Sequence, residues 1–382
     1  MSKRKNGEGS WGKKKIGKYT YNYYRDINGN YTYGKTIKEV NQKLTQKKEQ
    51  EFVLNNKTTF GEYINNWLLQ KKSTIEPTTY DCYETMIDSQ IINFKDYDLA
   101  NQQLSNLSRE TFQKYLDALA EKYSRATIKK IWVIIKQCIS YGEINNDVPI
   151  NTTKLVKVPI EANVKVKKKE VPFLTKNDAD KLYNIVSLTY SNGEPVYGSN
   201  ARALILIMYS GMRVSEMIAL KWKNVDIKNK RISIEQSAAE IKNRSNDGGN
   251  AYIQYDKSPK THDSERIIPL PNRAMEMIEW FENKNKNHTP DDYVCLSNNK
   301  TKINRRDINR TLKSMAKRAE CSITDLSVHS LRHTYGSILL SEGVDIKKVS
   351  ELLGHSDITV TYNIYIGILE NEKKDEVERV FN

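Results

Sequence analysis

Near the C-terminus, three histidines lie close to an arginine and to several tyrosines, and these residue types can carry out chemistry together. In the run His329-Ser-Leu-Arg332-His333, His329 and Arg332 are three residues apart, which places them on one face of a helix. His333 lies elsewhere on that helix, and we interpret it as structural. Arginine and histidine donate hydrogen bonds to phosphate oxygens, and a tyrosine hydroxyl can serve as a nucleophile. The pattern therefore marks this segment as a candidate site for chemistry.

Three further segments combine turns with the start or end of a helix or strand. Ser210-Gly-Met-Arg213-Val-Ser-Glu216 is a glycine-containing turn that leads into a helix, and Ser258-Pro-Lys260-Thr261 lies in the turn between two β-patterned runs. Leu352-Leu-Gly-His355 ends a helix, and Tyr362 and Tyr365 follow within one more helix. These two tyrosines are three residues apart and share a helical face, so helical periodicity alone does not separate them.

The chain is basic, and its excess charge is concentrated at the N-terminus. Its 382 residues contain 61 Lys and Arg against 47 Asp and Glu, a net charge of +14, and +9 of this charge lies in residues 1–50. Such an excess most often indicates a nucleic-acid partner, because bound lysines and arginines release the counterions of the phosphates.

Several classes of protein are excluded. The longest apolar run, residues 203–209, is much shorter than the roughly 20 residues of a transmembrane helix, so we expect no membrane span. No apolar segment follows the basic N-terminus, so we expect no secretory signal and a cytoplasmic protein. The four cysteines include no Cys-x-x-Cys pair, which argues against a zinc ribbon, a redox motif or a disulfide framework.

Tyrosines alternate with polar residues on both sides of a turn at residues 26–30, which predicts a small antiparallel sheet. Thr36 and Glu39 have the spacing of a capping box, so a helix is expected from there to about residue 52. A basic, tyrosine-rich sheet suits insertion into a DNA groove. The alternative is a solvated basic tail. Candidate DNA contacts here are Lys13, Lys15, Tyr19, Tyr21, Tyr23 and Arg25.

Helical periodicity dominates from residue 58 to about 155, where four or five helices are each introduced by Ser or Thr. One of them begins at Ser124 and places Arg125, Lys129 and Lys130 near its start, where they could bind phosphates. The alternative is a solvated helix face. Residues 156–172 are rich in lysine and lack periodicity, which predicts a basic linker.

The remaining segment, 173–382, alternates helices around 175–187, 200–209 and 213–221 with short β-runs at 231–236, 251–255 and 266–269, followed by more helices. The polar residues 240–250 are expected to form a surface loop. The predicted fold is mainly α-helical with small β-sheets, of the α+β class.

In order along the chain, the Gly211-Met-Arg213-Val-Ser-Glu216 turn, Lys260, the Arg266-Ile-Ile-Pro269 run, His329-x-x-Arg332, Leu353-Gly-His355 and Tyr365 resemble the signature of tyrosine recombinases of the phage integrase family. The resemblance is to integrases of conjugative transposons and prophages, and it covers nearly the whole chain. It implies an arm-type DNA-binding domain (1–55), a helical, SAM-like core-binding domain (58–155), the linker (156–172) and a catalytic domain (173–382).

The resemblance also implies roles for the site residues. Arg213 and Arg332 would bind the non-bridging phosphate oxygens, and Lys260 would protonate the leaving 5′ oxygen. Tyr365 would be the nucleophile, because its distance from His355 fits the family better than that of Tyr362. His329 and His355 would bind the phosphate, with His329 also helping to deprotonate the tyrosine. Glu216 would hold the site together, and neither a metal nor a cofactor is required.

The function that follows is site-specific cutting and rejoining of DNA through a 3′-phosphotyrosine intermediate and a Holliday junction, which integrates and excises a mobile element. The expected partners are double-stranded DNA with core-type and arm-type sites, three further copies of the chain in a tetramer on DNA, an excisionase and a host DNA-bending protein. Residues 369–382 would dock on a neighbouring protomer. Alternatives are a type IB-like topoisomerase, a DNA-binding regulator with an inactive recombinase-like domain, and an RNA-binding protein.

Overall fold

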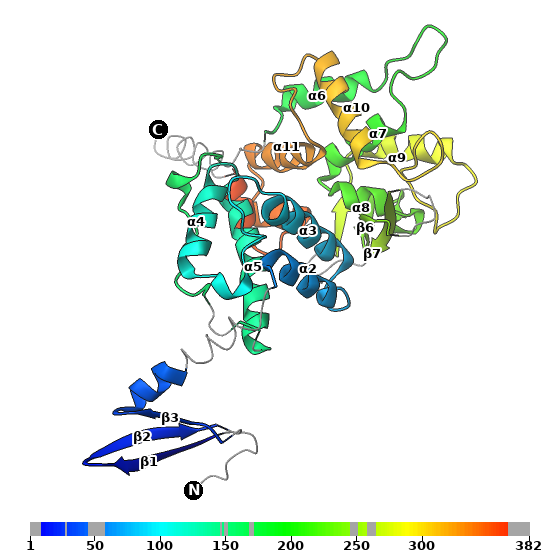
Figure 1. Cartoon of the computed structure of the whole chain (residues 1–382). Helices are drawn as coiled ribbons and strands as arrows, with labels where there is room; N and C mark the ends of the chain where they lie inside the picture. Colours follow the sequence, from blue (N-terminus) through cyan, green and yellow to red (C-terminus); the bar gives the residue numbers. More distant parts are fainter. Residues whose placement is uncertain are drawn as a thin grey trace. The chain divides into compact units, whose positions relative to one another are not determined.

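The computed structural model describes residues 9–26, 29–44, 58–145, 147–148, 152–167, 172–244, 251–257 and 265–365. The chain divides into two compact units, Met1–Lys169 and Glu170–Asn382. The predicted fold class is confirmed, since helices predominate and the strands form small antiparallel sheets (Figure 1). Within the described ranges, every helix is too short or too polar to cross a lipid bilayer.

The N-terminal segment is the predicted three-stranded antiparallel sheet, in which β2 lies between β1 and β3 (Figure 1). A helix follows at residues 37–44, and its start is capped as expected, because the Thr36 hydroxyl accepts from the backbone N–H of Glu39 at 3.1 Å. Residues 45–57, into which this helix was predicted to extend, lie outside the described residues. The strands are β1 (Ser10–Ile16), β2 (Tyr19–Arg25) and β3 (Tyr31–Gly34).

The register of this sheet divides its side chains between two faces. Lys13 pairs with Asn22 and Lys15 with Thr20, whereas Lys14 pairs with Tyr21. Residues directly opposite each other in an antiparallel sheet lie on the same face, and neighbours in one strand lie on opposite faces. The predicted DNA contacts are therefore divided: Lys13 and Lys15 lie on one face, and Tyr19, Tyr21, Tyr23 and Arg25 lie on the other.

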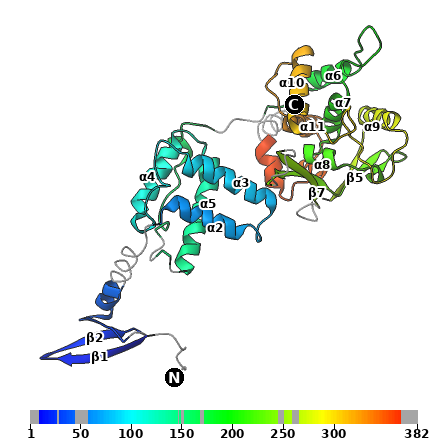
Figure 2. The ribbon, with the colours of Figure 1, turned by 45° about the vertical axis from the view of Figure 1, so that its right-hand side comes forward.

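The rest of the first unit is a bundle of α-helices around one apolar core, in which α2, α3 and α5 contact one another (Figure 2). Three of the Ser and Thr residues that predicted helix starts cap them: Thr59 accepts from the backbone N–H of Glu62, Ser108 from Thr111 and Ser124 from Thr127. The start expected at Thr78 was wrong, because α3 begins with Pro77 after Glu76 and has no side-chain cap. The elements are α2 (Phe60–Lys71), α3 (Pro77–Ile87), a π-helical turn (Asp88–Ile92), a 3₁₀ turn (Leu104–Asn106), α4 (Arg109–Ala120) and α5 (Arg125–Ile144).

Part of the predicted linker packs on this bundle. Val164 is buried in the bundle's core, and the backbone N–H of Lys165 donates to Ala120 O at 3.0 Å. A 3₁₀ turn, Glu161–Asn163, lies just before these contacts. Residues 168–171 lie outside the described residues, and the boundary between the two units falls among them.

The second unit packs its helices and two small sheets around another apolar core. In one sheet β5 lies between β4 and β8, and β6 pairs with β7 in the other. The helices are α6 (Lys176–Ile185), α7 (Ser199–Ser210), α8 (Val214–Ala219), the 3₁₀ turn η4 (Trp222–Asn224), α9 (Asn272–Lys284), α10 (Arg305–Arg318), α11 (Val328–Ser341) and α12 (Ile346–Leu353). The strands are β4 (Val225–Asp226), β5 (Arg231–Ile234), β6 (Ser237–Lys242), β7 (Tyr252–Lys257) and β8 (Arg266–Pro269).

Strand β6 corrects one prediction. Residues 240–242 were expected in a surface loop but pair with β7, where Ile241 lies opposite Ile253. The strand was missed because Ala238 and Ala239, which are buried in it, have little intrinsic preference for strands. Residues 245–250 of the predicted loop lie outside the described residues.

We expect Phe112→Ala to lower the free energy of unfolding of the first unit by about 3–5 kcal/mol. The ring of Phe112 is fully buried and packs edge-on against Phe60 and Trp132, so its removal leaves a cavity. Leu69→Ala is the matched control, because Leu69 is largely exposed, and should cost less than about 0.5 kcal/mol. Urea unfolding followed by circular dichroism measures both, and equal losses would contradict this core assignment.

Candidate active site

The site is built around a buried carboxylate at the start of α8. Arg213 is the N-cap residue of α8, and its backbone N–H donates to Glu216 Oε2 at 2.7 Å. The Arg213 side chain donates through Nη1 to Glu216 Oε1 at 2.7 Å. Arg266, on β8, contacts the same carboxylate from Nη1 at 3.1 Å and from Nη2 at 2.8 Å. One carboxylate therefore fixes two arginines from separate elements.

The C-terminal end of α12 accepts hydrogen bonds from three arginines. Arg266 Nε donates to Leu352 O at 2.8 Å, and Arg213 Nη2 donates to Gly354 O at 2.9 Å. Arg332 Nη2 donates to the carbonyl between them, that of Leu353. The last carbonyls of a helix have no partner within the helix and lie at the negative end of its dipole, so they favour cations. This turn brings the two predicted phosphate-binding arginines together.

Two glycines in the left-handed conformation make this arrangement possible. Gly354, at φ +63°, ends α12, and a Cβ there would lie only 2.9 Å from Arg266 Nη1. Gly211, at φ +67°, ends α7, and its carbonyl accepts from Arg332 Nη1 at 2.9 Å. A side chain at either position would be both strained and crowded.

Burial and charge set the protonation of these groups. Burial alone would raise the pKa of Glu216, but the hydrogen bonds and charge of Arg266, together with Arg213, lower it, so the carboxylate is ionised. Arg332 is almost fully buried, which with the charge of Arg213 lowers its pKa to about 9. It still carries its proton at neutral pH. Three positive charges therefore surround one negative charge.

The predicted histidines border this cluster. His329 is exposed at the start of α11, and partial loss of hydration and the charges of Arg332 and Arg213 lower its pKa. His355 follows α12, and its Nδ1 is 2.8 Å from the Thr361 hydroxyl. Burial, Arg332 and Arg213 lower its pKa to about 4. Both rings are thus neutral at pH 7, and each can still donate one hydrogen bond.

The structure contradicts the expectation that His333 points away from the site. Its ring packs edge-on against His329 at 4.5 Å between centroids, and its Nδ1 is 3.4 Å from the hydroxyl oxygen of Tyr365. Burial, His329 and Arg332 lower its pKa to about 4, so it is neutral and can accept a hydrogen bond. The spacing was the available signal, because residues four apart share a helix face.

The two candidate tyrosines differ in burial, although they lie in one helical segment, residues 358–365. Tyr362 is 37% exposed, whereas Tyr365 is 1% exposed and lies over Gly336 of α11. Burial raises the pKa of Tyr365, and the charge of Arg332 opposes this rise. Tyr365, not Tyr362, is thus the tyrosine next to the histidines and near the arginines.

The remaining predicted residues are distributed as follows. Lys260 lies outside the described residues. Arg125 Nε donates to Pro159 O at 3.0 Å, so this side chain is engaged with its own unit, whereas Lys129 and Lys130 are exposed. Residues 369–382, predicted to dock on another protomer, also lie outside the described residues.

The prediction did not include Arg266 among the site residues, although a charged residue in a short apolar strand was a signal.

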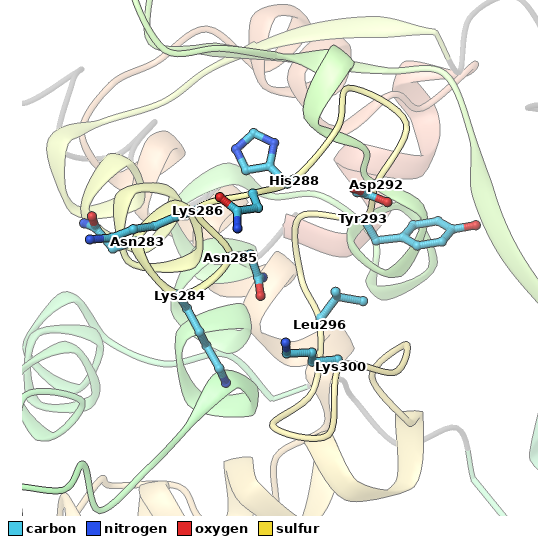
Figure 3. Close-up of a pocket in the computed structure, with 10 residues that line it drawn as sticks. Asn283, Lys284, Asn285, Lys286, His288, Asp292, Tyr293, Leu296 and Lys300 are labelled. Atoms are coloured by element: carbon cyan, nitrogen blue, oxygen red, sulfur yellow. The ribbon is translucent and has the colours of Figure 1, made fainter.

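A separate pocket of about 490 Å³ lies at the end of α9, and none of the predicted catalytic residues lines it (Figure 3). Lys284, Lys286, Lys300 and His288 give it a basic lining. Within the described ranges, no group of three or more His, Cys, Asp or Glu side chains comes together as possible metal ligands. Among the described residues, the arginine cluster beside Tyr365 combines fixed positive charges with a hydroxyl, an arrangement suited to phosphoryl transfer.

Comparison with known proteins agrees with this geometry. The model of the phage integrase family matches residues 172–372, which is more than half of the chain. The chain belongs to the phage integrase family. The model of the phage integrase N-terminal SAM-like domain matches residues 59–120. The chain is accordingly an enzyme of the tyrosine recombinase class.

Individual relatives match over most of their length. A tyrosine recombinase XerC-like protein of Caldanaerobacter subterraneus subsp. tengcongensis is 26% identical over 93% of each chain. A Tn1549 transposon integrase, solved with transposon right end DNA, has a TM-score of 0.66 at 19% identity, covering 85% of this chain and 100% of its own. A lambda integrase tetramer bound to a Holliday junction gives a TM-score of 0.56 at 16% identity, covering 90% and 92%. These two structures establish the fold.

We expect the second unit to lose stability as the pH falls from about 7 to about 5, in part because of His333. The pKa of His333 falls from 6.5, its ordinary value, to about 4 in the folded chain. Between these values the unfolded chain binds a proton that the folded chain does not, so stability falls with pH. His333→Asn should reduce the drop in Tm by about 4–8 °C, equivalent to about 2 kcal/mol.

Differential scanning calorimetry at the two pH values measures this effect. His355→Asn should act in the same direction, because the pKa of His355 is lowered similarly. An identical pH dependence in wild type and His333→Asn would show that this ring is not kept neutral by burial.

Proposed function

We propose that the chain is a site-specific DNA recombinase that cuts and rejoins duplex DNA through a 3′-phosphotyrosine intermediate and a Holliday junction, and that it integrates and excises a mobile genetic element. The observation that carries this proposal is the convergence of Arg213 and Arg332 on one turn, with Tyr365 buried beside the adjacent helix α11. Two fixed guanidinium groups match the oxygens of a phosphodiester, and a tyrosine ester preserves the energy of the broken bond for rejoining.

The residues divide the reaction between them. The Tyr365 oxygen attacks phosphorus and forms the P–O bond, while the bond to the 5′ oxygen breaks and that oxygen takes a proton, which Lys260 supplies. Arg213 and Arg332 stabilise the charge that develops on the non-bridging oxygens, and His329 and His355 donate further hydrogen bonds. Rejoining is the reverse reaction, in which a DNA 5′ hydroxyl attacks the phosphotyrosine.

The proton of Tyr365 has two possible acceptors in the proposed mechanism. His329 is exposed and borders the arginines, so it can reach both the phosphate and a tyrosine that has moved toward it. His333 contacts the hydroxyl in the described conformation and orients it. Because both rings are neutral at pH 7, either can accept a hydrogen bond from the phenol.

Solved structures of similar integrases support the proposed partners. The Tn1549 integrase was solved with transposon end DNA and lambda integrase as a tetramer on a Holliday junction, which supports a DNA-bound tetramer for this chain too. The N-terminal sheet would bind arm-type sites, and the helical bundle, through Lys129 and Lys130, core-type sites. An excisionase and a host DNA-bending protein complete the proposal, which implies action in the cytoplasm. The proposal includes an arm-type domain at residues 1–55, a core-binding domain at 58–155, a linker at 156–172 and a catalytic domain at 173–382.

Covalent trapping on labelled, nicked duplexes from the ends of the element tests the chemistry. Wild type and Tyr362→Phe should give a protein-linked DNA band under denaturing conditions. Tyr365→Phe should lose at least about a thousandfold in adduct, because it lacks the attacking oxygen, yet should bind DNA as tightly as wild type. Tyr362→Phe is the matched control, as the same hydroxyl is removed three residues away.

Other outcomes would redirect the assignment. Loss of the adduct in Tyr362→Phe alone would make Tyr362 the nucleophile. Tight DNA binding without an adduct from wild type would favour the DNA-binding regulator. Adducts and relaxation of supercoiled DNA without pairing of two sites would favour the type IB-like topoisomerase. Tighter binding to RNA than to duplex DNA would favour an RNA-binding protein.

Alanine substitutions in the N-terminal sheet test the arm-type site. Lys13 and Lys15 are exposed on one face, and Lys13→Ala should weaken binding to arm-type DNA and reduce the slope of log K against log salt by about 1. Lys14→Ala removes the same charge from the opposite face and should leave the slope nearly unchanged. The reverse result would place the DNA on the face with Tyr21 and Tyr23.

A further inference from the structure

Arg266 lies beside Arg213 and Arg332 in the arginine cluster, although it is not among the groups assigned to the reaction. Its side chain is only 7% exposed. Both terminal nitrogens of its guanidinium contact the two oxygens of Glu216, and its Nε donates to Leu352 O at 2.8 Å. These contacts direct all three of its nitrogens toward protein groups.

The charge balance explains why such a residue is needed. Glu216 fixes Arg213, but an ionised carboxylate in contact with Arg213 also offsets the positive charge that a phosphate should meet. Arg266 contributes one further positive charge in contact with the same carboxylate. The pair of Glu216 and Arg266 is neutral, so the charges of Arg213 and Arg332 remain available.

The contact with α12 adds a geometric role. Arg266 binds the carbonyl of Leu352, and the next two carbonyls bind Arg332 and Arg213. β8 is thereby tied to the turn on which the other two arginines rest. At Gly354, a Cβ would collide with the Arg266 side chain, so the fit is tight.

We propose that Arg266 is a positioning residue, which neutralises Glu216 and holds the end of α12, so that Arg213 and Arg332 meet a phosphate with their full charge. The proposal rests on the function proposed above. The competing role is that Arg266 binds the phosphate itself. Its forked contact with the charged carboxylate of Glu216, which occupies both of its terminal nitrogens, argues against this role.

A charge-compensation experiment separates the two roles. Single-turnover adduct formation on a nicked duplex is measured for wild type, Arg266→Met, Glu216→Gln and the double variant, with DNA affinity measured in parallel. Arg266→Met leaves Glu216 uncompensated, and should slow the reaction by about 10- to 100-fold, the effect typical of residues that orient groups at a reactive centre. The double variant restores the charge balance and should recover to within about tenfold of wild type.

Each other result has a defined meaning. If wild type forms no adduct, the proposed function fails. If wild type reacts and Arg266→Met reacts equally fast, Arg266 has no positioning role. If the double variant is as slow as Arg266→Met or slower, charge compensation is refuted and direct phosphate binding is favoured. Should Arg266→Met fail to fold, the double variant is compared with wild type, and a loss above about a hundredfold overturns the proposal.

Discussion

The ion pairs of the buried Glu216 carboxylate are the interactions on which the arginine cluster of the second unit depends. Placing a carboxylate in the interior is costly unless charges and hydrogen bonds compensate it, and here Arg213 and Arg266 do so. In return, the carboxylate determines where both guanidinium groups lie. α8 and β8 are separated by about 50 residues in the chain, and this one group joins them.

Main-chain carbonyls at the end of α12 also fix the arginines. Helix α12 ends in a left-handed glycine, and its last carbonyls are left for the arginines. Arg213, Arg266 and Arg332 are therefore held in part by main-chain carbonyls, whose positions are set by helix geometry. This arrangement would keep Arg213 and Arg332 in place when they meet a phosphate in the proposed reaction.

Much of this site could be predicted from the sequence, because the motifs around Arg213, Arg332 and His355 are local and occur in a definite order. The capping residues Thr59 and Ser108 likewise predicted real helix starts. Strand β6 could not be predicted, since its pairing with β7, and not the preference of its own residues, stabilises it. The contact network of Arg266 also escaped prediction, because it depends on three elements meeting in space.

The burial of Tyr365 has a consequence for the order of events. In the proposed mechanism Tyr365 attacks the phosphate, and because this residue is only 1% exposed, the helical segment at residues 358–365 would have to shift relative to α11 before a strand is cut. Binding and cutting are therefore separate steps with separate rates. A recombinase that works by the proposed mechanism could sample many DNA sites and leave each of them unbroken, since encounter alone would not expose Tyr365.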